Sequence, residues 1–275
     1  MKARRSAWKR HAVLVPLAIV FLFPLLWVVV TSLKTNGEVL NNPVSMIPSF
    51  QFGNYPDVIE RINFWRELFN TLVMTLGVTF GQIILCALAG YAFARLKFLG
   101  RDILFVVVLA TLIIPFEILF VPIFNMLSGW GWTNTFLALI VPSLASPFSI
   151  FVFRQFFITL PRELEEAATV DGAGTYRIFF SIALPLATPA VATVFILTFL
   201  GEWSNLLKPL VFVTSPDMYT LQQGLAITLN KGSNLTPDVA TTMCGVVLTS
   251  IVPVAMFLVG QRFFIRSIVA SGIKG

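Results

Sequence analysis

The sequence predicts an all-α integral membrane protein with about six membrane-spanning helices, and three observations support this fold class. Of the 275 residues, 57% are hydrophobic and only 12% are charged, whereas a soluble domain is about 45–50% apolar and about 25% charged. The apolar residues gather into six long runs, and about 20 apolar residues cross a bilayer as a helix. Lys and Arg are distributed unevenly between the runs. We expect residues 1–275 to form a single transmembrane domain.

Each run must be helical, because an open strand would leave backbone groups without partners in hydrocarbon. The predicted spans are residues 12–31, 70–93, 103–127, 135–157, 184–206 and 240–260. The first run follows five basic residues, as the core of a secretory signal does, but it is too long for a typical signal core and contains Pro16 and Pro24. We therefore expect an uncleaved first span.

The basic residues predict the orientation. With the N-terminus in the cytoplasm, 14 of the 19 Lys and Arg residues lie inside and 5, including Lys208 and Lys231, lie outside. This bias places both ends of the chain in the cytoplasm, in agreement with an even number of spans. The residues behind the net charge of +6 thus lie at the ends of the spans, where they act as orientation signals. We therefore expect no nucleic-acid partner. We expect a multi-pass protein of the cell membrane.

The sequence offers little for catalysis or metal binding. Its one histidine, His11, lies in the basic N-terminal segment, and Cys86 and Cys244 lie alone within apolar runs. Buried cysteines of this kind behave as small apolar residues, and their spacing forms no zinc or disulfide pattern. A membrane-embedded enzyme is therefore disfavoured, and we expect no catalytic residue, metal or cofactor in this chain.

The longest predicted cytoplasmic loop, residues 158–183, has the pattern of a short helix–turn–helix. Pro161 suits the first turn of a helix, and the carboxylates that follow it complement the helix dipole. Gly172 and Gly174 can end that helix in a left-handed turn, and Thr175 is a candidate N-cap for a second helix over about 176–182. The element could dock into a groove on a soluble partner or be a solvated connection, and its periodicity leaves both interpretations open.

The same loop carries a spaced motif. Glu166-Ala167-Ala168 is followed after three residues by Gly172, and after nine more by Ile182-Ala183-Leu184-Pro185. This pattern resembles the "EAA" loop of permease subunits of bacterial ABC importers at every position. The segments Tyr91–Phe98 and Gln261–Phe264 and the ending Gly272-Ile273-Lys274-Gly275 resemble the sugar-importing branch of that family, with the maltose-type and glycerol-phosphate-type permeases most similar. Trp203-Ser204-Asn205 departs from the branch, which more often has Trp-Asn.

The resemblance implies a type I importer permease whose loop is a coupling helix held by an ATPase subunit. The coupling residues it implies are Glu165, Glu166, Ala167, Ala168, Asp171 and Gly172. It also implies a second permease subunit, two ATPase subunits, an extracytoplasmic solute-binding protein and a carbohydrate-type solute. Since this chain has no Gly-x-x-x-x-Gly-Lys-Ser/Thr phosphate loop, ATP and Mg²⁺ are expected on the ATPase subunits.

Three polar residues in or near the spans are candidates for a solute pathway: Glu117, Glu202 and Asn205. A carboxylate in a span that faces lipid is costly, so Glu117 should face a pathway or another helix. Glu202 and Asn205 could face solute or mark the membrane interface. An ion-coupled secondary transporter is the alternative, but it leads one to expect more intramembrane carboxylates and often an internal repeat. A stripe of small residues, Gly77, Gly81 and Cys86 with Ala89 and Gly90, gives the second span a thin side and predicts close helix packing.

Overall fold

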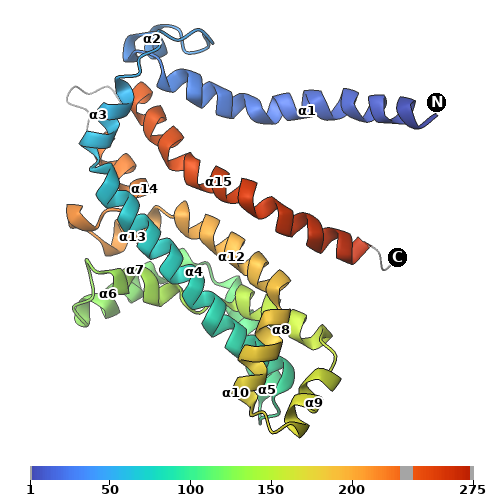
Figure 1. Ribbon diagram of the computed structural model, residues 1–275. Coiled ribbons are helices and arrows are strands. Elements are labelled where there is room, and N and C mark those ends of the chain that lie inside the picture. The colour runs from blue at the N-terminus through green and yellow to red at the C-terminus, as the bar shows by residue number, and fades with distance from the viewer. Residues whose placement is uncertain (1, 230–237, 273–275) are drawn as a thin grey trace. The chain divides into compact units, whose positions relative to one another are not determined.

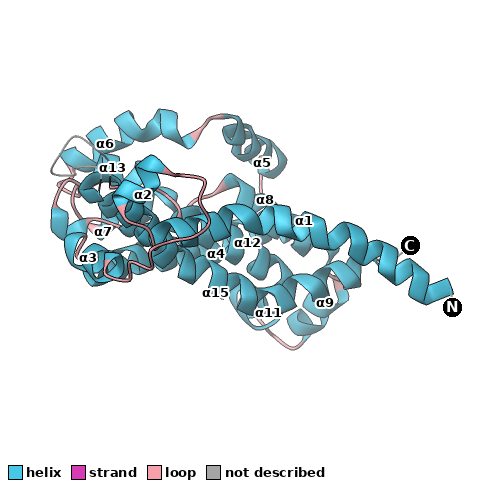
Figure 2. Ribbon diagram, turned by 90° about the horizontal axis from the view of Figure 1, so that it is seen from above, coloured by secondary structure: helices cyan, strands magenta, loops and turns pink. Residues whose placement is uncertain are grey.

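The computed structural model describes residues 2–229 and 238–272, and every regular element in these residues is helical (Figure 2). Lys231 and the ending at residues 273–275, which entered the orientation and resemblance predictions, lie outside the described residues. Contacts divide the chain into two compact units, Met1–Arg66 with Gly224–Val254, and Glu67–Gln223 with Ala255–Gly275. The expectation of one transmembrane domain stays a prediction.

Among the described residues, three helices are long and apolar enough to cross a membrane without interruption, at Leu14–Ser32, Phe64–Arg95 and Val239–Gly260. They belong to α1 (Lys2–Ser32), α4 (Phe64–Arg95) and α15 (Val239–Gly272). Three further candidate spans are helix pairs bent by 91°, 46° and 75°. The six predicted spans therefore have counterparts in the structure, and the third, fourth and fifth are broken.

The breaks follow the prolines. The first pair comprises α5 (Arg101–Ala110) and η1 (Thr111–Ile113), then η2 (Phe116–Leu119) and α6 (Phe120–Gly129). Ile114 is extended between its two halves, with a φ of −87° and a ψ of 112°. Pro115 follows it, and a residue before proline is driven out of the helical region. Broken spans of this kind need neighbouring helices or polar side chains to satisfy the freed backbone groups.

The second pair breaks in the same way, at the extended Ser146 before Pro147, whereas Ala187 at the bend of the third pair has a φ of −79° and a ψ of 15°. The second joins α7 (Phe136–Ile140) and η3 (Val141–Ser143) to α8 (Pro147–Thr159), and the third joins the segment Thr175–Leu186 to α12 (Thr188–Trp203). Pro147 opens α8, where its missing N–H costs no helical hydrogen bond. The third pair bends at Ala187, which is fully buried.

The first unit is organised around the end of α1. It includes α2 (Asn36–Asn41), α3 (Asn54–Arg61), the π-helical segment η6 (Leu225–Leu229) and the first part of α15. The Asn54 amide donates to the carbonyl oxygens of Ser32 and Lys34, at 3.0 and 2.9 Å. The Cys244 thiol donates to the Ser32 carbonyl from α15. These bonds satisfy carbonyls that the end of α1 leaves unpaired.

A capping box opens α2. Thr35 and Glu38 exchange the two reciprocal bonds of this motif. The backbone N–H of Thr35 and the hydroxyl of Ser49 hold the pKa of Glu38 below its ordinary value, because both donate to the ionised carboxylate.

In the second unit, α4 packs closely through the predicted glycine stripe, which is confirmed. A Cβ placed on Gly90 would lie 2.7 Å from Phe153 Cβ and 2.9 Å from the backbone nitrogen of Arg154. A Cβ on Gly77 would lie 2.7 Å from the Ile140 side chain, and one on Gly81 would overlap Leu144. Because these three positions of α4 carry no side chain, α7, α8 and the break between them can approach its backbone closely.

The end of α4 that carries Arg95 is fixed by aromatic packing. Tyr91 lies edge-on to Phe157 of α8, with ring centroids 5.4 Å apart, and 5.3 Å from Phe179. All three side chains are buried. Edge-to-face contacts add to the stability gained from burial. They tie α4 to α8 and to the π-helical segment η4 (Phe179–Ala183). Figure 1 shows α4 and α8 side by side at this end.

We predict that Gly90→Ala destabilises the fold, because the added methyl group meets backbone and Cβ atoms that cannot move away separately. The expected loss is about 1–3 kcal/mol, as for other overpacked sites. The matched control is Gly129→Ala at the end of α6, where a Cβ meets no atom within 4 Å. Thermal unfolding of the detergent-purified protein measures both, and equal midpoints for the two variants would contradict the close approach.

Candidate functional site

The segment between the fourth and fifth candidate spans forms a short helix with a well-defined end. Helix α9 runs over Glu163–Val170, with three carboxylates in its first turn. The backbone N–H of Gly172 donates to the Thr169 carbonyl at 3.0 Å, and that of Ala173 donates to the Ala168 carbonyl at 2.9 Å. These two bonds form a Schellman motif, with Gly172 in the left-handed region at a φ of +79°. The predicted glycine stop is confirmed at Gly172.

Two local predictions for this segment were wrong. Helix α9 begins at Glu163 with Arg162 as its N-cap, so Pro161 precedes the helix and is not in its first turn. The next helix, α10 (Thr175–Ile178), has Gly174 as its N-cap, and Thr175 is already helical. That helix continues through η4 and α11 (Leu184–Leu186) up to the bend at Ala187. The turn between α9 and α10 comprises residues 171–174.

Helix α9 presents one face outward. Glu163, Glu166, Ala167 and Val170 recur at helical spacing and are all exposed. Val170 is 88% exposed, and the neighbouring Tyr176 of α10 is 77% exposed. Asp171 and Gly172 are exposed beside them, whereas Ala168 is only partly exposed. This face combines two carboxylates, a small residue and an apolar residue.

The opposite side of α9 is tied to α4 by a buried ion pair. Arg95 Nε lies 3.1 Å from Glu165 Oε1, and the two side chains are only 6% and 18% exposed. The same guanidinium donates to the Leu160 carbonyl, just before α9. Because Tyr91 lies one turn earlier on α4, the ion pair continues the aromatic packing of that end. Glu165 is therefore turned inward and is separated from the exposed face that holds Glu166 and Ala167.

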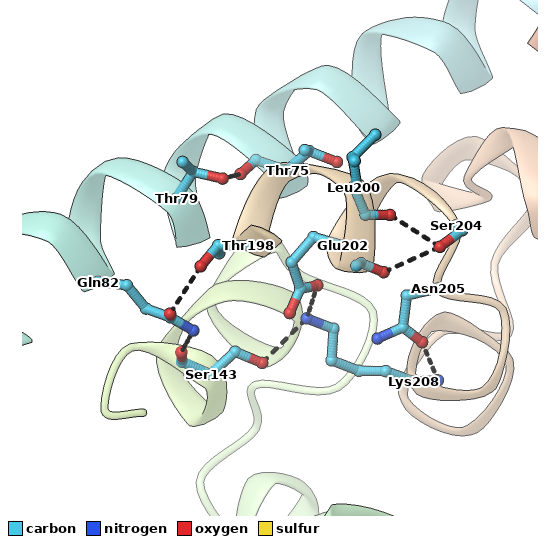
Figure 3. Close-up of polar contacts among 11 residues, drawn as sticks. Thr75, Thr79, Gln82, Ser143, Thr198, Leu200, Glu202, Ser204, Asn205 and Lys208 are labelled. Carbon is cyan, nitrogen blue, oxygen red and sulfur yellow. Dashed lines mark hydrogen bonds and ion pairs between the residues drawn. The ribbon is translucent and has the colours of Figure 1, made fainter. Parts of the chain in front are cut away.

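A second polar cluster lies between α4, α8 and α12 (Figure 3). The Gln82 amide nitrogen donates to the Ser143 carbonyl at 2.7 Å, and its oxygen accepts from Ser149 and Thr198, both at 3.0 Å. Gln82 and Ser149 are buried. The amide thus joins three elements and satisfies the Ser143 carbonyl, which the break between η3 and α8 leaves outside the helical ladder.

The cluster ends in a buried ion pair. Lys208 Nζ of α13 (Leu207–Phe212) contacts Glu202 Oε2 of α12 and donates to the Ser143 hydroxyl at 3.0 Å. The Lys208 side chain is 0% exposed, and that of Glu202 is 12% exposed. A buried charge is tolerated only when it is paired and hydrogen-bonded. The pair and its serine partner therefore hold α12, α13 and η3 together.

The three predicted pathway residues are not brought together. Glu202 lies in this cluster, whereas the Asn205 side-chain oxygen accepts from the backbone N–H of Lys208 at 3.1 Å, which is a local bond at the start of α13. Glu117 lies in η2, directly after the 91° bend, and is exposed. No described hydrogen bond or ion pair connects Glu117 to the cluster.

Sequence reasoning missed Gln82, Lys208 and Arg95. Lys208 was assigned to an external loop because it follows the fifth apolar run, yet it is among the most deeply buried side chains described. Two signals were available. Gln82 is an isolated amide within an apolar run, and Lys208 follows Glu202 by six residues at the end of another. Polar residues in such positions tend to pair with one another.

The broken spans, the buried polar cluster and the projecting helix define a helical membrane-transport subunit. Residues 82–265 match the model of the family of binding-protein-dependent transport system inner membrane components. The chain belongs to this family, and it is an ABC importer permease.

Relatives agree with this assignment over nearly the whole chain. The arabinooligosaccharides transport system permease protein AraQ of Halalkalibacterium halodurans is 35% identical over 94% of this chain and 93% of its own length. The sn-glycerol-3-phosphate transport system permease protein UgpE of Pectobacterium atrosepticum is 33% identical over 95% of each chain. The diacetylchitobiose uptake system permease protein NgcG of Streptomyces coelicolor is 36% identical over 81% of this chain and 74% of its own.

A solved structure confirms the fold. A chain from the crystal structure of a bacterial ABC transporter involved in the import of the acidic polysaccharide alginate matches with a TM-score of 0.79. The match covers 96% of this chain and 98% of that chain at 24% identity. The predicted all-α type I permease architecture is thereby confirmed.

We predict that Gly172→Ala weakens the end of α9, because a residue with a Cβ pays about 1–2 kcal/mol to adopt the left-handed region. Gly174→Ala is the matched control, two residues away, since Gly174 has a φ of −75° and open space around it. Amide hydrogen exchange over residues 163–175 measures the effect. Exchange in the Gly172 variant should be about tenfold faster or more, and equal exchange in both variants would contradict the Schellman geometry.

Proposed function

We propose that this chain forms half of the pore of an ATP-driven importer in the cell membrane, together with a second permease subunit. Two ATPase subunits bind ATP and Mg²⁺, and an extracytoplasmic protein delivers the solute. The observation that carries the proposal is the exposed, capped α9, which is fixed to α4 by the Arg95–Glu165 ion pair. The chain needs no cofactor of its own for this function.

The exposed face of α9 supports docking to an ATPase subunit on the cytoplasmic side. Ala167 allows close approach, Glu163 and Glu166 provide charge, and Val170 adds an apolar contact. A short helix that lays such a face into a groove is a common mode of recognition. Among the predicted coupling residues, Glu166, Ala167, Asp171 and Gly172 face outward, whereas Glu165 acts through α4 and Ala168 is partly covered.

The ion pair supports the transmission of movement. ATP binding and hydrolysis on the partners must favour one of two packings of the pore helices. A load on α9 passes through Glu165 to Arg95, and then to the aromatic contacts of Tyr91 with Phe157 and Phe179. These contacts make a rigid connection from α9 to the body of the second unit, so that α9 and α4 move together.

Relatives support a carbohydrate-type solute. AraQ and NgcG are named for oligosaccharides, and UgpE is named for sn-glycerol-3-phosphate. Both groups of compounds are rich in hydroxyl groups, which suit a pathway lined by amide, hydroxyl and carboxylate groups.

We predict that Arg95→Glu lowers solute-stimulated ATP hydrolysis by about tenfold or more in the reconstituted complex, because it places two carboxylates together and releases α9. The double variant Arg95→Glu/Glu165→Arg should recover much of the activity. Arg101→Glu is the control, since the described ion pair of Arg101 is with its neighbour Asp102 at a more exposed position. Full stimulation in the Arg95 variant, or uptake that persists without any ATPase subunit, would overturn the proposal.

A further inference from the structure

We propose that a cavity beside the Glu202–Lys208 pair is a subsite for a neutral, hydroxyl-rich solute and that it discriminates against phosphate esters. The cavity has a volume of about 230 Å³ and lies between α4, α8 and α12. Its lining includes Gln82, Ser149, Thr198 and Glu202, with Phe148 and Gly201 at its sides. The inference rests on the proposed function and specifies the class of solute.

The negative charge that lines the cavity disfavours the binding of an anionic solute. Glu202 lines the cavity, whereas its partner Lys208 is fully buried and does not line it. The ammonium group is already held by the Glu202 carboxylate and the Ser143 hydroxyl. A bound solute would therefore meet the carboxylate first, and no Lys or Arg stands among the described lining residues. A phosphate group would be repelled there, because like charges at close range are strongly unfavourable.

The hydrogen-bonding groups suit a sugar hydroxyl. Glu202 uses Oε2 for Lys208, and a carboxylate has several further acceptor sites. A hydroxyl both donates and accepts, so it can bond to a carboxylate and a serine or threonine hydroxyl at once. Gln82 is held in one orientation by Ser143, Ser149 and Thr198. The cluster is therefore organised before a solute arrives, which lowers the cost of binding.

The walls of the cavity combine an aromatic ring with open space beside it. Phe148 is 43% exposed and offers an aromatic surface to the apolar C–H face of a sugar. Gly201 leaves open space, since a Cβ there would meet no atom within 4 Å. A carboxylate on this face of a spanning helix would be costly against lipid. The Lys208 ammonium group offsets this cost, and Glu202, which is 12% exposed, still lines the cavity.

The test uses a Gly201→Cys variant in the complete transporter, assembled with its ATPase subunits and its second permease subunit. Cys86 and Cys244 are buried, so maleimide labelling reports on residue 201. The probes are arabinotriose and N,N′-diacetylchitobiose, which are neutral, and sn-glycerol-3-phosphate, which is anionic. A neutral probe present at about twice its Kd should slow labelling about threefold, and sn-glycerol-3-phosphate should leave the rate unchanged.

A second variant tests the role of the charge. In the Gly201→Cys background, Glu202→Gln leaves Lys208 without its counter-ion, so protection by sn-glycerol-3-phosphate should appear and protection by the neutral probes should fall. The double change Glu202→Gln/Lys208→Met removes both charges and should abolish that new protection. Ser204→Ala is the matched control, because the described hydrogen bonds of the Ser204 hydroxyl go to the Leu200 and Gly201 carbonyls of the preceding helix, α12.

The outcomes separate this inference from the proposed function. If neither neutral probe protects residue 201, or if sn-glycerol-3-phosphate protects it equally, the subsite is disproved. ATP hydrolysis stimulated by solute-loaded binding protein is measured on the same samples. Stimulation without protection overturns the subsite alone, whereas a complex that never shows stimulation overturns the importer function itself.

Discussion

The close packing of α4 against α7, η3 and α8 is the constraint on which the second unit depends. Gly77, Gly81 and Gly90 bring the backbone of α4 within van der Waals contact of Ile140, Leu144 and Phe153. In a membrane, such contacts replace the hydrophobic effect as the force between helices, because lipid tails are as apolar as the side chains. A thin helix surface is therefore the condition for the polar and ionic contacts that α4 makes along its length.

Two of those contacts give α4 its functional importance. Gln82 faces the break between η3 and α8 and satisfies a carbonyl that the broken helix leaves free. Arg95, about three and a half turns later, holds Glu165 and the carbonyl of Leu160, three residues before α9 begins. The polar cluster and α9 are thus both attached to α4. In the proposed coupling, movement imposed on α9 reaches the elements around Gln82 through α4.

The sequence predicted the parts of the fold that depend on apolar run length and on single-residue conformations. The six apolar runs, the glycine stripe and the left-handed Gly172 each follow from local chemistry that tertiary contacts do not change. The position of the breaks was less accessible. Prolines are common in spanning helices, and the sequence alone does not say that Ile114 and Ala187 bend sharply while Pro16 and Pro24 stay within a helix.

The candidate site was predicted only where its residues are neighbours in the sequence. The exposed residues of α9 stand in one sequence motif, but the ion pair that fixes α9 joins Arg95 and Glu165, which lie 70 positions apart. Glu202 was found as an intramembrane carboxylate, whereas its partner Lys208 had the pattern of a loop charge. Partners brought together by packing leave little trace in the spacing of either residue.

The most direct test of the account is the accessibility of Ala167→Cys on α9. The substitution is small, its position is exposed, and the native cysteines are buried. A membrane-impermeant maleimide should label residue 167 only from the cytoplasmic face, and the ATPase subunits should block that labelling once they are bound. Labelling from the external face, or labelling that the ATPase subunits leave unchanged, would contradict the claim that α9 couples this permease to ATP hydrolysis.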